Sequence, residues 1–561
     1  MGASTLTGRI REAYARIADV DRPEIWISLR PEADVLAEAE LIARRTEEGD
    51  HLPLAGVLVA VKDNIDVAGL ETTAGSRAFG YAPSADAPSV ARIRAAGAIV
   101  LGKTNLDQFA TGLVGTRSPF GAVRNAWDPE RISGGSSSGS AVATALGIVD
   151  VALGTDTAGS GRVPAALNGI FGIKPTVGLV PATGVVPACR TLDCVTVFAR
   201  DLGLGRRVVE IMTGPDGVDP LCRSDAPAAP LDAAPRIAIP TQEHLAGLAE
   251  GWAEAFAGVV EQLRASGVEI VEVDITPLLE AASLLYGGAF VAERTAAVGD
   301  FIRSHPELHG TDLDPTVAQI VLGGDSASAA DYFRDRERLD RLGLEGERRL
   351  DGTVALLTPT TTWHPTLAEV AADPIGANAR MGRYTNFANL LDRSALAVPA
   401  GFVGGLPFGV MLTGAPFADR TLAEIARRIA APDIEILVVG AHLRDQPLNA
   451  QLVAQGGSFV AEVQTAPEYR LHALPTAPPK PGLRRVPEDG VAIAGEVWRL
   501  PAAGFGSFVA SLPQPMTIGQ VKLADGTSVA GFLCEPVAVD AAPDISASGG
   551  WRAHLVSQRA D

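Results

Sequence analysis

The chain has 561 residues, of which 47 are basic and 66 are acidic, so its formal net charge at pH 7 is −19. This acidity argues against a nucleic-acid partner, because phosphate binding needs clustered lysine and arginine. Hydrophobic residues make up 47% of the chain, which is enough for a sizeable core and excludes a disordered protein. The four cysteines are too few and too scattered for a disulfide framework or a zinc site, which indicates a reducing, cytoplasmic location.

Neither the N-terminus nor the apolar segments of the chain predict a targeting signal or a membrane anchor. The first twenty residues lack the apolar core of a secretory signal, and Leu6 stands where a myristoylated protein needs Ser or Thr. The stretch from Ser394 to Ala418 is uncharged and long enough to cross a bilayer. Its five glycines and three prolines predict short buried strands and turns instead.

The pattern of apolar residues divides the chain into two predicted domains. Residues 1–50 have amphipathic spacing and predict helices. Between residues 51 and 432, helical patterns alternate with continuous apolar runs, which predicts an α/β domain with a large mixed, mostly parallel sheet covered by helices on both faces. Residues 433–561 predict a smaller β-rich α+β domain of short strands, including one at residues 507–512.

Two short motifs match known patterns but lack the structural context that their chemistry needs. Residues Gly97–Thr104 match a P-loop, yet the predicted strand lies between the two glycines, so its amides should belong to a sheet rather than to a phosphate. Residues Gly135–Gly139 match a nucleophile elbow, which requires a buried strand that runs directly into the serine. No such strand is predicted before Ser137, and we reject both motifs.

Two loops rich in Gly, Ser and Thr, residues Ser133–Ser140 and Gly154–Pro164, lie between strongly patterned elements. Such loops indicate backbone amides that are exposed for an anion or an oxyanion. A serine nucleophile here needs a base, and no histidine occurs between residues 52 and 243. Lys62 ends a predicted buried strand, where burial should lower its pKa, and it is one of only three lysines before residue 480. Lys62 is therefore the candidate base.

Three segments together resemble the amidase signature family over about residues 50–430: GVLVAVKDNIDV, SGGSSSGSAVATA and LGTDTAGSGRVPAALNGIFGIKPT. The resemblance implies an acyl-enzyme mechanism with Lys62 as base, Ser136 as the bridging residue on a cis peptide bond, and Ser160 as nucleophile. It also implies an oxyanion hole formed by the backbone amides of Thr157, Ala158, Gly159 and Ser160.

Two departures from the commonest family pattern resemble the allophanate hydrolase branch. These are the Ala158–Arg162 run and the Ser-Ser-Ser-Gly-Ser loop, and the segment GVVPACRTLDCVTVFAR (184–200) resembles that branch as well. The C-terminal segments VVGAHLRDQPLNAQL and GFLCE resemble its extra domain, which is related in fold to γ-glutamyl cyclotransferases. The resemblance implies hydrolysis of allophanate (urea-1-carboxylate) to ammonia and carbon dioxide or bicarbonate. It implies no metal or cofactor, a homodimer, and functional coupling to urea carboxylase or to a biuret-forming pathway of cyanuric acid breakdown.

Tyr286 and Arg294 match, by this resemblance, a pair that binds the substrate carboxylate. Both lie in a segment that predicts one helix, two turns apart, about 12 Å along its axis and within roughly 80° around it. The alternative is a surface arginine near Glu293 and a tyrosine that packs in the core. His442 is a candidate for work on the second intermediate, or a structural histidine bonded to a neighbouring backbone group.

Two other readings of the whole chain stay open at this point. Another amidase signature amidohydrolase, or the amidase subunit of a tRNA-dependent amidotransferase, would share the catalytic residues, although the amidotransferase subunit would not need the C-terminal domain. From a different class, the C-terminal unit could make the chain a binding or assembly protein in a nitrogen-metabolism complex. Release of ammonia by the purified protein alone would favour an autonomous enzyme.

Overall fold

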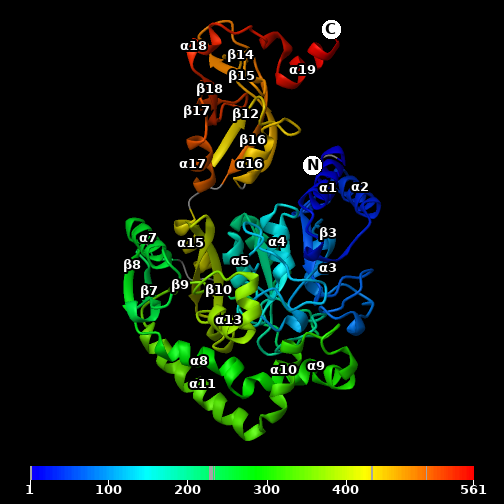
Figure 1. Ribbon diagram of the computed structural model, residues 1–561, viewed down its shortest axis with the longest axis vertical. Coiled ribbons are helices and arrows are strands. Elements are labelled where there is room, and N and C mark those ends of the chain that lie inside the picture. The colour runs from blue at the N-terminus through cyan, green and yellow to red at the C-terminus, as the bar shows by residue number, and fades with distance from the viewer. Residues whose placement is uncertain are drawn as a thin grey trace. The chain divides into compact units, whose positions relative to one another are not determined.

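In the computed structural model, the described residues are 3–226, 231–232, 234–430, 434–455, 457–500 and 502–560. The chain divides into two compact units, residues 1–430 and 431–561 (Figure 1). The predicted domain boundary between residues 432 and 433 lies outside the described residues. Within the described part of the chain, no helix is both long enough and apolar enough to cross a bilayer.

The first unit is built on one large mixed sheet, as predicted, although antiparallel pairings outnumber the parallel ones that were expected to dominate. Its strands, in spatial order, are β1 (Trp26–Leu29), β3 (Ile99–Thr104), β2 (Leu58–Lys62), β4 (Val151–Asp156), β6 (Cys194–Ala199), β5 (Phe171–Lys174), β10 (Ser394–Val403), β11 (Leu406–Gly414), β9 (Ala355–Pro359), β7 (Arg236–Pro240) and β8 (Glu269–Val273). The parallel pairings are confined to two groups, β3-β2-β4 and β9-β7-β8, and the strands between these groups pair antiparallel.

Helices cover both faces of this sheet, as the continuous apolar strands predict. Alternate residues of β2 belong to two different hydrophobic clusters, Val59 and Val61 to one and Leu58 and Ala60 to the other. The helices of this unit are α1 (Ala3–Val20), α2 (Glu32–Glu47), α3 (Pro88–Ala95), α4 (Ser138–Ala145), α5 (Val163–Asn168), α6 (Leu202–Met212), α7 (Trp252–Ala265), α8 (Thr276–Gly287), α9 (Ala292–Ser304), α10 (Pro315–Gly323), α11 (Ala329–Arg349), α12 (Leu367–Ala372), α13 (Pro374–Met381), α14 (Asn386–Leu390) and α15 (Asp419–Ile429).

The prediction that residues 1–50 are helical is wrong over the four residues of β1. Pro23 and Pro31 flank this strand, and proline interrupts a helix because it has no amide hydrogen. β1 then pairs antiparallel with β3, with Trp26 opposite Thr104. The uncharged Ser394–Ala418 stretch forms the hairpin of β10 and β11, as its glycines and prolines predict, and this hairpin is buried except near its turn.

The second unit is β-rich, as predicted. A five-stranded sheet has the order β13 (Ser458–Gln464), β16 (Ala494–Leu500), β12 (Ile434–Val438), β18 (Ser528–Cys534) and β17 (Met516–Lys522), and β14 (Tyr469–Leu474) pairs with β15 (Lys480–Arg485). The helices of this unit are α16 (Asn449–Ala454), α17 (Ala502–Ala510), α18 (Pro536–Val539) and α19 (Trp551–Ala560). The likeness to γ-glutamyl cyclotransferases stays a prediction.

The predicted strand at residues 507–512 is wrong, because helix α17 covers most of that segment. Phe505 and Phe508 of α17 are three residues apart, and both pack in the hydrophobic cluster of this unit. That spacing places them on one face of a helix, whereas a strand would turn them to different faces. Residues 507–512 considered alone are too few to show this helical period.

Candidate active site

Lys62 is the last residue of β2, and its side chain is completely buried. Its Nζ lies 2.8 Å from Ser136 Oγ and 2.7 Å from Thr155 Oγ1. Burial lowers the pKa of Lys62 to about 7, and the carboxylates of Asp107, Asp193 and Asp156 only partly oppose this effect. A large share of the amine is therefore neutral near pH 7, with a lone pair that can accept a proton from Ser136.

The loop before α4 holds Ser136 in a tightly packed conformation. The Gly135–Ser136 peptide bond is cis, as the resemblance implies. The backbone amide of Asp107 donates to the Ser136 carbonyl oxygen at 3.0 Å. A Cβ atom at position 135 would lie 2.1 Å from Asp107 Oδ2, so only glycine fits there. The close packing explains why a glycine must precede Ser136.

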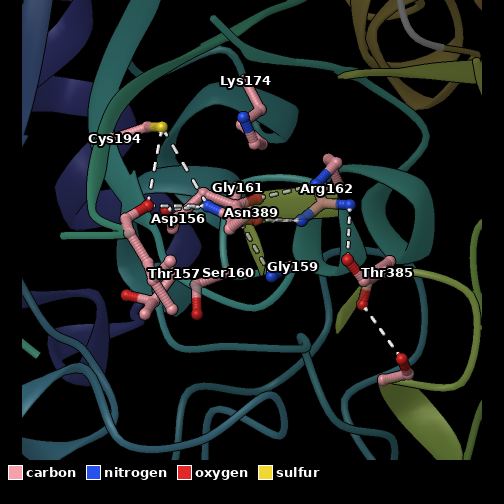
Figure 2. Close-up of polar contacts among 12 residues, drawn as sticks. Asp156, Thr157, Gly159, Ser160, Gly161, Arg162, Lys174, Cys194, Thr385 and Asn389 are labelled. Atoms are coloured by element: carbon pink, nitrogen blue, oxygen red, sulfur yellow. Dashed lines mark hydrogen bonds and ion pairs between the residues drawn. The ribbon is translucent and has the colours of Figure 1, made fainter. Parts of the chain in front are cut away.

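An ion pair between Asp156 and Arg162 braces the loop that carries Ser160 (Figure 2). Arg162 donates to both carboxylate oxygens of Asp156, from Nε at 2.9 Å and from a terminal nitrogen at 2.8 Å, and both side chains are fully buried. Burial raises the pKa of Asp156, but the Arg162 guanidinium and the hydrogen bonds outweigh it and hold the pKa below its usual value. In Figure 2 the side chains of Ser160 and Thr157 point away from this ion pair.

One of the four predicted oxyanion-hole amides does not fit that role. The amide of Gly159 donates to Asp156 Oδ1 at 2.8 Å, so it is directed into the brace rather than toward a substrate. The amides of Thr157, Ala158 and Ser160 donate to no other group in the part of the chain that the structure describes. These three amides are therefore available for an oxyanion, and Gly159 has to be removed from the predicted set.

The hydroxyl of Ser160 donates to the carbonyl oxygen of Gly112 at 3.4 Å. Among the described residues, no hydrogen bond joins Ser160 to Ser136. Lys62 and Ser136 are thus already in contact, whereas the expected third member of the triad is directed at a different partner. Ser160 is buried, and its hydroxyl must turn toward Ser136 before a proton can pass along the three side chains.

Tyr286 and Arg294 contact each other, although the single helix predicted for them is wrong. α8 ends at Gly287, Gly288 is extended, and α9 starts at Ala292. Asp335 of α11 accepts the amide of Ala289 at 2.7 Å and so stabilises this break. Across the break, Arg294 donates to the Tyr286 hydroxyl at 3.1 Å.

Arg294 is buried and reaches the same backbone segment as Ser160. Its second terminal nitrogen donates to Thr111 Oγ1 at 3.0 Å and to the Ala110 carbonyl at 3.4 Å. The tripeptide Ala110–Gly112 therefore contacts the guanidinium at one end and the Ser160 hydroxyl at the other. Because consecutive Cα atoms are about 3.8 Å apart, the cation and the nucleophile lie in one site. Arg294 Nε is buried and has no hydrogen-bond partner among the described residues.

Comparison with known proteins agrees with this geometry. The Amidase family model matches residues 9–423, and the model of the allophanate hydrolase C-terminal domain matches residues 434–556. The chain belongs to the Amidase family. It is 43% identical over 572 residues to a urea amidolyase of Lachancea kluyveri, and the match covers 94% of this chain and 31% of that protein. The chain thus spans about a third of the length of the urea amidolyases that it matches.

Two further Amidase relatives cover most of their own lengths. The structure of Kluyveromyces lactis allophanate hydrolase matches 99% of this chain and 97% of its own, with 39% identity and a TM-score of 0.71. A glutamyl-tRNA(Gln) amidotransferase subunit from Symbiobacterium thermophilum is 37% identical and matches 74% of this chain and 91% of its own. The first of these matches covers nearly the whole chain and so includes the C-terminal unit.

His442 lies in that C-terminal unit, in a cavity of about 320 Å³. Its ring is stacked on Phe532, with centroids 5.0 Å apart, and its Nε2 lies 3.1 Å from Gln451 Oε1. Burial lowers the pKa of His442, and Lys480, which also lines the cavity, lowers it further. At pH 7 the ring is neutral and faces a space that can hold a small polar molecule.

Sequence reasoning missed several polar residues of this Amidase site. Thr155, which contacts Lys62, and the Asp156–Arg162 pair lie within the Gly154–Pro164 loop, where their polar character among glycines was the available signal. Thr111 carries no such signal in the sequence. Outside the site, Glu243, His244 and Asp274 form a cluster that could ligate a metal, but Asp274 Oδ1 already accepts hydrogen bonds from His244 and Thr276.

The activity of this amidase should depend on pH through Lys62. Its neutral fraction increases as pH rises through about 7, so kcat/KM should rise about tenfold per pH unit below 7 and level off above 8. A pH–rate profile with an acid-stable amide measures this rise in kcat/KM, and thermal unfolding at each pH shows whether the protein stays folded. A profile that is flat through pH 7 would contradict the role of Lys62 as base.

Proposed function

We propose that the chain is an allophanate hydrolase, which uses Ser160, Ser136 and Lys62 to cleave the terminal amide of allophanate. The observation that carries this proposal is the Ala110–Gly112 tripeptide, which contacts both the Ser160 hydroxyl and the Arg294 guanidinium. Allophanate has a carboxylate two bonds from its amide carbonyl carbon, so an arginine so close to the nucleophile suits this substrate. The guanidinium fork, with the Tyr286 hydroxyl beside it, suits a carboxylate.

Acylation begins when the Ser160 hydroxyl turns from Gly112 toward Ser136. Neutral Lys62 accepts the proton of Ser136, which accepts the proton of Ser160, and Ser160 Oγ attacks the terminal carbonyl carbon. The amides of Thr157, Ala158 and Ser160 stabilise the negative oxygen of the tetrahedral intermediate. Arg294 binds the carboxylate and fixes the orientation of the amide.

The leaving group and the two products follow from the same residues. Lys62, now protonated, returns the proton through Ser136 to the amide nitrogen, the C–N bond breaks, and ammonia leaves. Water then attacks the ester carbonyl with Lys62 as base, which releases N-carboxycarbamate and restores Ser160. N-carboxycarbamate loses carbon dioxide, and the remaining carbamate yields ammonia and a second carbon dioxide or bicarbonate.

We assign the loss of carbon dioxide from N-carboxycarbamate to the C-terminal unit as its proposed role. The cavity around His442 also exposes Lys480, a cation for a carboxylate, and Gln451. Neutral His442 can exchange a proton with an intermediate that loses carbon dioxide. The alternative for His442 is purely structural, through its hydrogen bond to Gln451 and its packing on Phe532.

Replacement of His442 by alanine in the full chain should separate the two steps. We expect release of the first ammonia at close to the original rate and accumulation of N-carboxycarbamate, because the catalytic serine loop contains no residue of the C-terminal unit. ¹³C NMR with labelled allophanate, together with an ammonia assay, follows both products. Loss of the first ammonia in a folded variant, or no accumulation of the intermediate, would assign His442 a structural role.

The amidotransferase alternative has one specific observation in its favour, which is the 37% identity to a glutamyl-tRNA(Gln) amidotransferase subunit. That match covers 74% of this chain, whereas residues 434–556 match the allophanate hydrolase C-terminal domain. The C-terminal unit therefore favours allophanate hydrolase over this alternative and over a simple amidase. It also provides the place for an assembly function, which is compatible with catalysis.

The supply of allophanate and the assembly of the protein belong to the same proposal. Because the relatives that share this region are urea amidolyases of about three times the matched length, we propose coupling to an enzyme that forms allophanate from urea. Cyanuric acid breakdown is the second source. A cytoplasmic location and a homodimer stay predictions.

A panel of substrates tests the proposed function with the purified full chain alone. Ammonia release should be fastest with allophanate, slower with its isostere malonamate, and slowest with urea, biuret and acetamide. Autonomous turnover of allophanate would also distinguish the protein from an amidotransferase subunit. Equal rates for malonamate and acetamide would contradict the proposal, because they would show that the carboxylate is not recognised.

A further inference from the structure

A short segment, Ala188–Asp193, lies between the loop of Ser160 and the helix of Arg294, and the proposed mechanism gives it no role. It belongs to the Gly184–Arg200 stretch, which resembles the allophanate hydrolase branch in sequence. The segment is a closed turn, because the amides of Leu192 and Asp193 both donate to the Cys189 carbonyl at 2.9 Å. These hydrogen bonds hold the residues of the turn at fixed distances from one another.

One end of the segment is fixed to the oxyanion loop. Asp193 accepts hydrogen bonds from Thr157 Oγ1 at 2.5 Å and from the amides of Ala188 at 2.9 Å and Cys189 at 3.3 Å. Asp193 is buried and has no cation within ion-pair distance in the described residues, so these donors supply its stabilisation. Thr157 also provides one of the three free amides, so this carboxylate holds the oxyanion hole in place.

A second contact joins the same end to the brace behind Ser160. Asn389 donates through Nδ2 to the carbonyl oxygens of both Asp156 and Leu192, at 2.8 and 3.0 Å. The Asn389 side chain also accepts a hydrogen bond from Arg162 at 2.9 Å. Figure 2 shows Asn389 between Asp156 and Arg162. The Ser160 loop and the segment therefore share one buried network.

The middle of the segment, at Thr191, is fixed to the start of α9. Glu293 accepts from the Thr191 amide at 2.6 Å and from the Thr191 hydroxyl at 2.8 Å. The next residue is Arg294, whose guanidinium is close enough to the Cys189 thiol to oppose the rise in thiol pKa that burial causes. The segment thus links the residue next to the carboxylate-binding arginine with the oxyanion loop.

We propose that the Ala188–Asp193 segment is a length gauge, which fixes the distance between the Arg294 guanidinium and the Ser160 loop and so selects substrates by the separation of carboxylate and amide. The inference rests on the proposed function of Arg294. In allophanate and malonamate a single atom separates the carboxylate carbon from the amide carbonyl carbon. In succinamate two atoms separate them, so succinamate needs a site that is longer by about one C–C bond, ~1.5 Å. Thr191, the exposed residue of the segment, and Glu293 act as positioning residues.

The test compares the full chain with Glu293→Ala and Thr191→Val variants. We measure kcat/KM for malonamate, succinamate and acetamide. Because a misplacement of about 1 Å can change rates by about 100-fold, the malonamate-to-succinamate ratio should fall by about 10- to 100-fold in Glu293→Ala and by less in Thr191→Val, which keeps its backbone amide. The acetamide rate should stay within about twofold, since the oxyanion loop is held by Asp193.

Glu307 is an exposed carboxylate elsewhere on the surface, and Glu307→Ala is the matched control. It should change neither the malonamate-to-succinamate ratio nor the acetamide rate. An unchanged malonamate-to-succinamate ratio in both folded variants would overturn the length gauge. An equal fall for all three substrates would also overturn it, because it would place the segment in catalysis alone. The unmodified protein tests the proposed function separately. If it shows no preference for malonamate over acetamide, both the proposed function and the length gauge are refuted.

Discussion

Replacement of Lys62 by arginine should reduce kcat for allophanate by about ten-thousand-fold or more, although the variant keeps a positive charge. The mechanism needs a group that gives up its proton near pH 7, and burial lowers the pKa of Lys62 to about 7. A guanidinium stays protonated under these conditions and cannot accept the proton of Ser136. Steady-state ammonia release measures the effect.

Two companion variants separate the loss of a base from the loss of the fold. Lys62→Met removes both charge and base and should be as inactive as Lys62→Arg. Lys522→Arg, at a half-exposed lysine of the C-terminal unit, should leave kcat unchanged. Thermal unfolding shows whether each variant is folded. A folded Lys62→Arg protein with substantial activity would refute the proposed base.

Replacement of Arg294 by alanine should lower kcat/KM for allophanate and malonamate by about 100- to 1000-fold, while acetamide turnover changes little. Arg294 is buried, and its loss leaves the substrate carboxylate without a charged partner in a buried site. Acetamide has no carboxylate and gains nothing from the guanidinium. Comparing the two substrates removes any general effect on the catalytic residues.

Arg303 provides the control for this prediction, because it lies on the same helix but is exposed and paired with Asp300 and Asp325. Arg303→Ala should leave both rates unchanged. Arg294→Lys should recover part of the malonamate rate, since it keeps the charge but not the two-pronged geometry. If malonamate and acetamide fall equally in Arg294→Ala, the arginine is structural and the carboxylate site is elsewhere.

Much of the fold follows from local patterns in the sequence. The continuous apolar run that ends at Lys62 predicts a strand buried on both faces, and β2 belongs to two hydrophobic clusters as a consequence. The proline-bounded strand β1 was missed because its pairing with β3 depends on residues about 75 positions away in sequence, which a local period does not show. The helix at α17 was missed for the opposite reason, because six residues are too short a window to show a helical period.

The site was predictable where chemistry constrains a single residue and unpredictable where several backbone groups decide the outcome. Lys62 follows from its expected burial and Ser136 from the family resemblance, and the structure places their side chains in contact. The Gly159 amide was misassigned because its direction depends on the Asp156 carboxylate, which fixes it in the brace. The break between Tyr286 and Arg294 had a signal in the adjacent glycines 287 and 288, since glycine weakens a helix, but the contact across it depends on the tertiary fold.

The most direct test of the account is the detection of an acyl-enzyme on Ser160. Rapid quenching of the full chain with malonamate or allophanate, followed by intact mass and peptide mapping, should show an adduct equal to the substrate minus ammonia on the peptide that contains Ser160. The Ser160→Ala protein should carry no adduct and release no ammonia. An adduct on another residue, or ammonia release that persists in folded Ser160→Ala, would contradict the proposed mechanism.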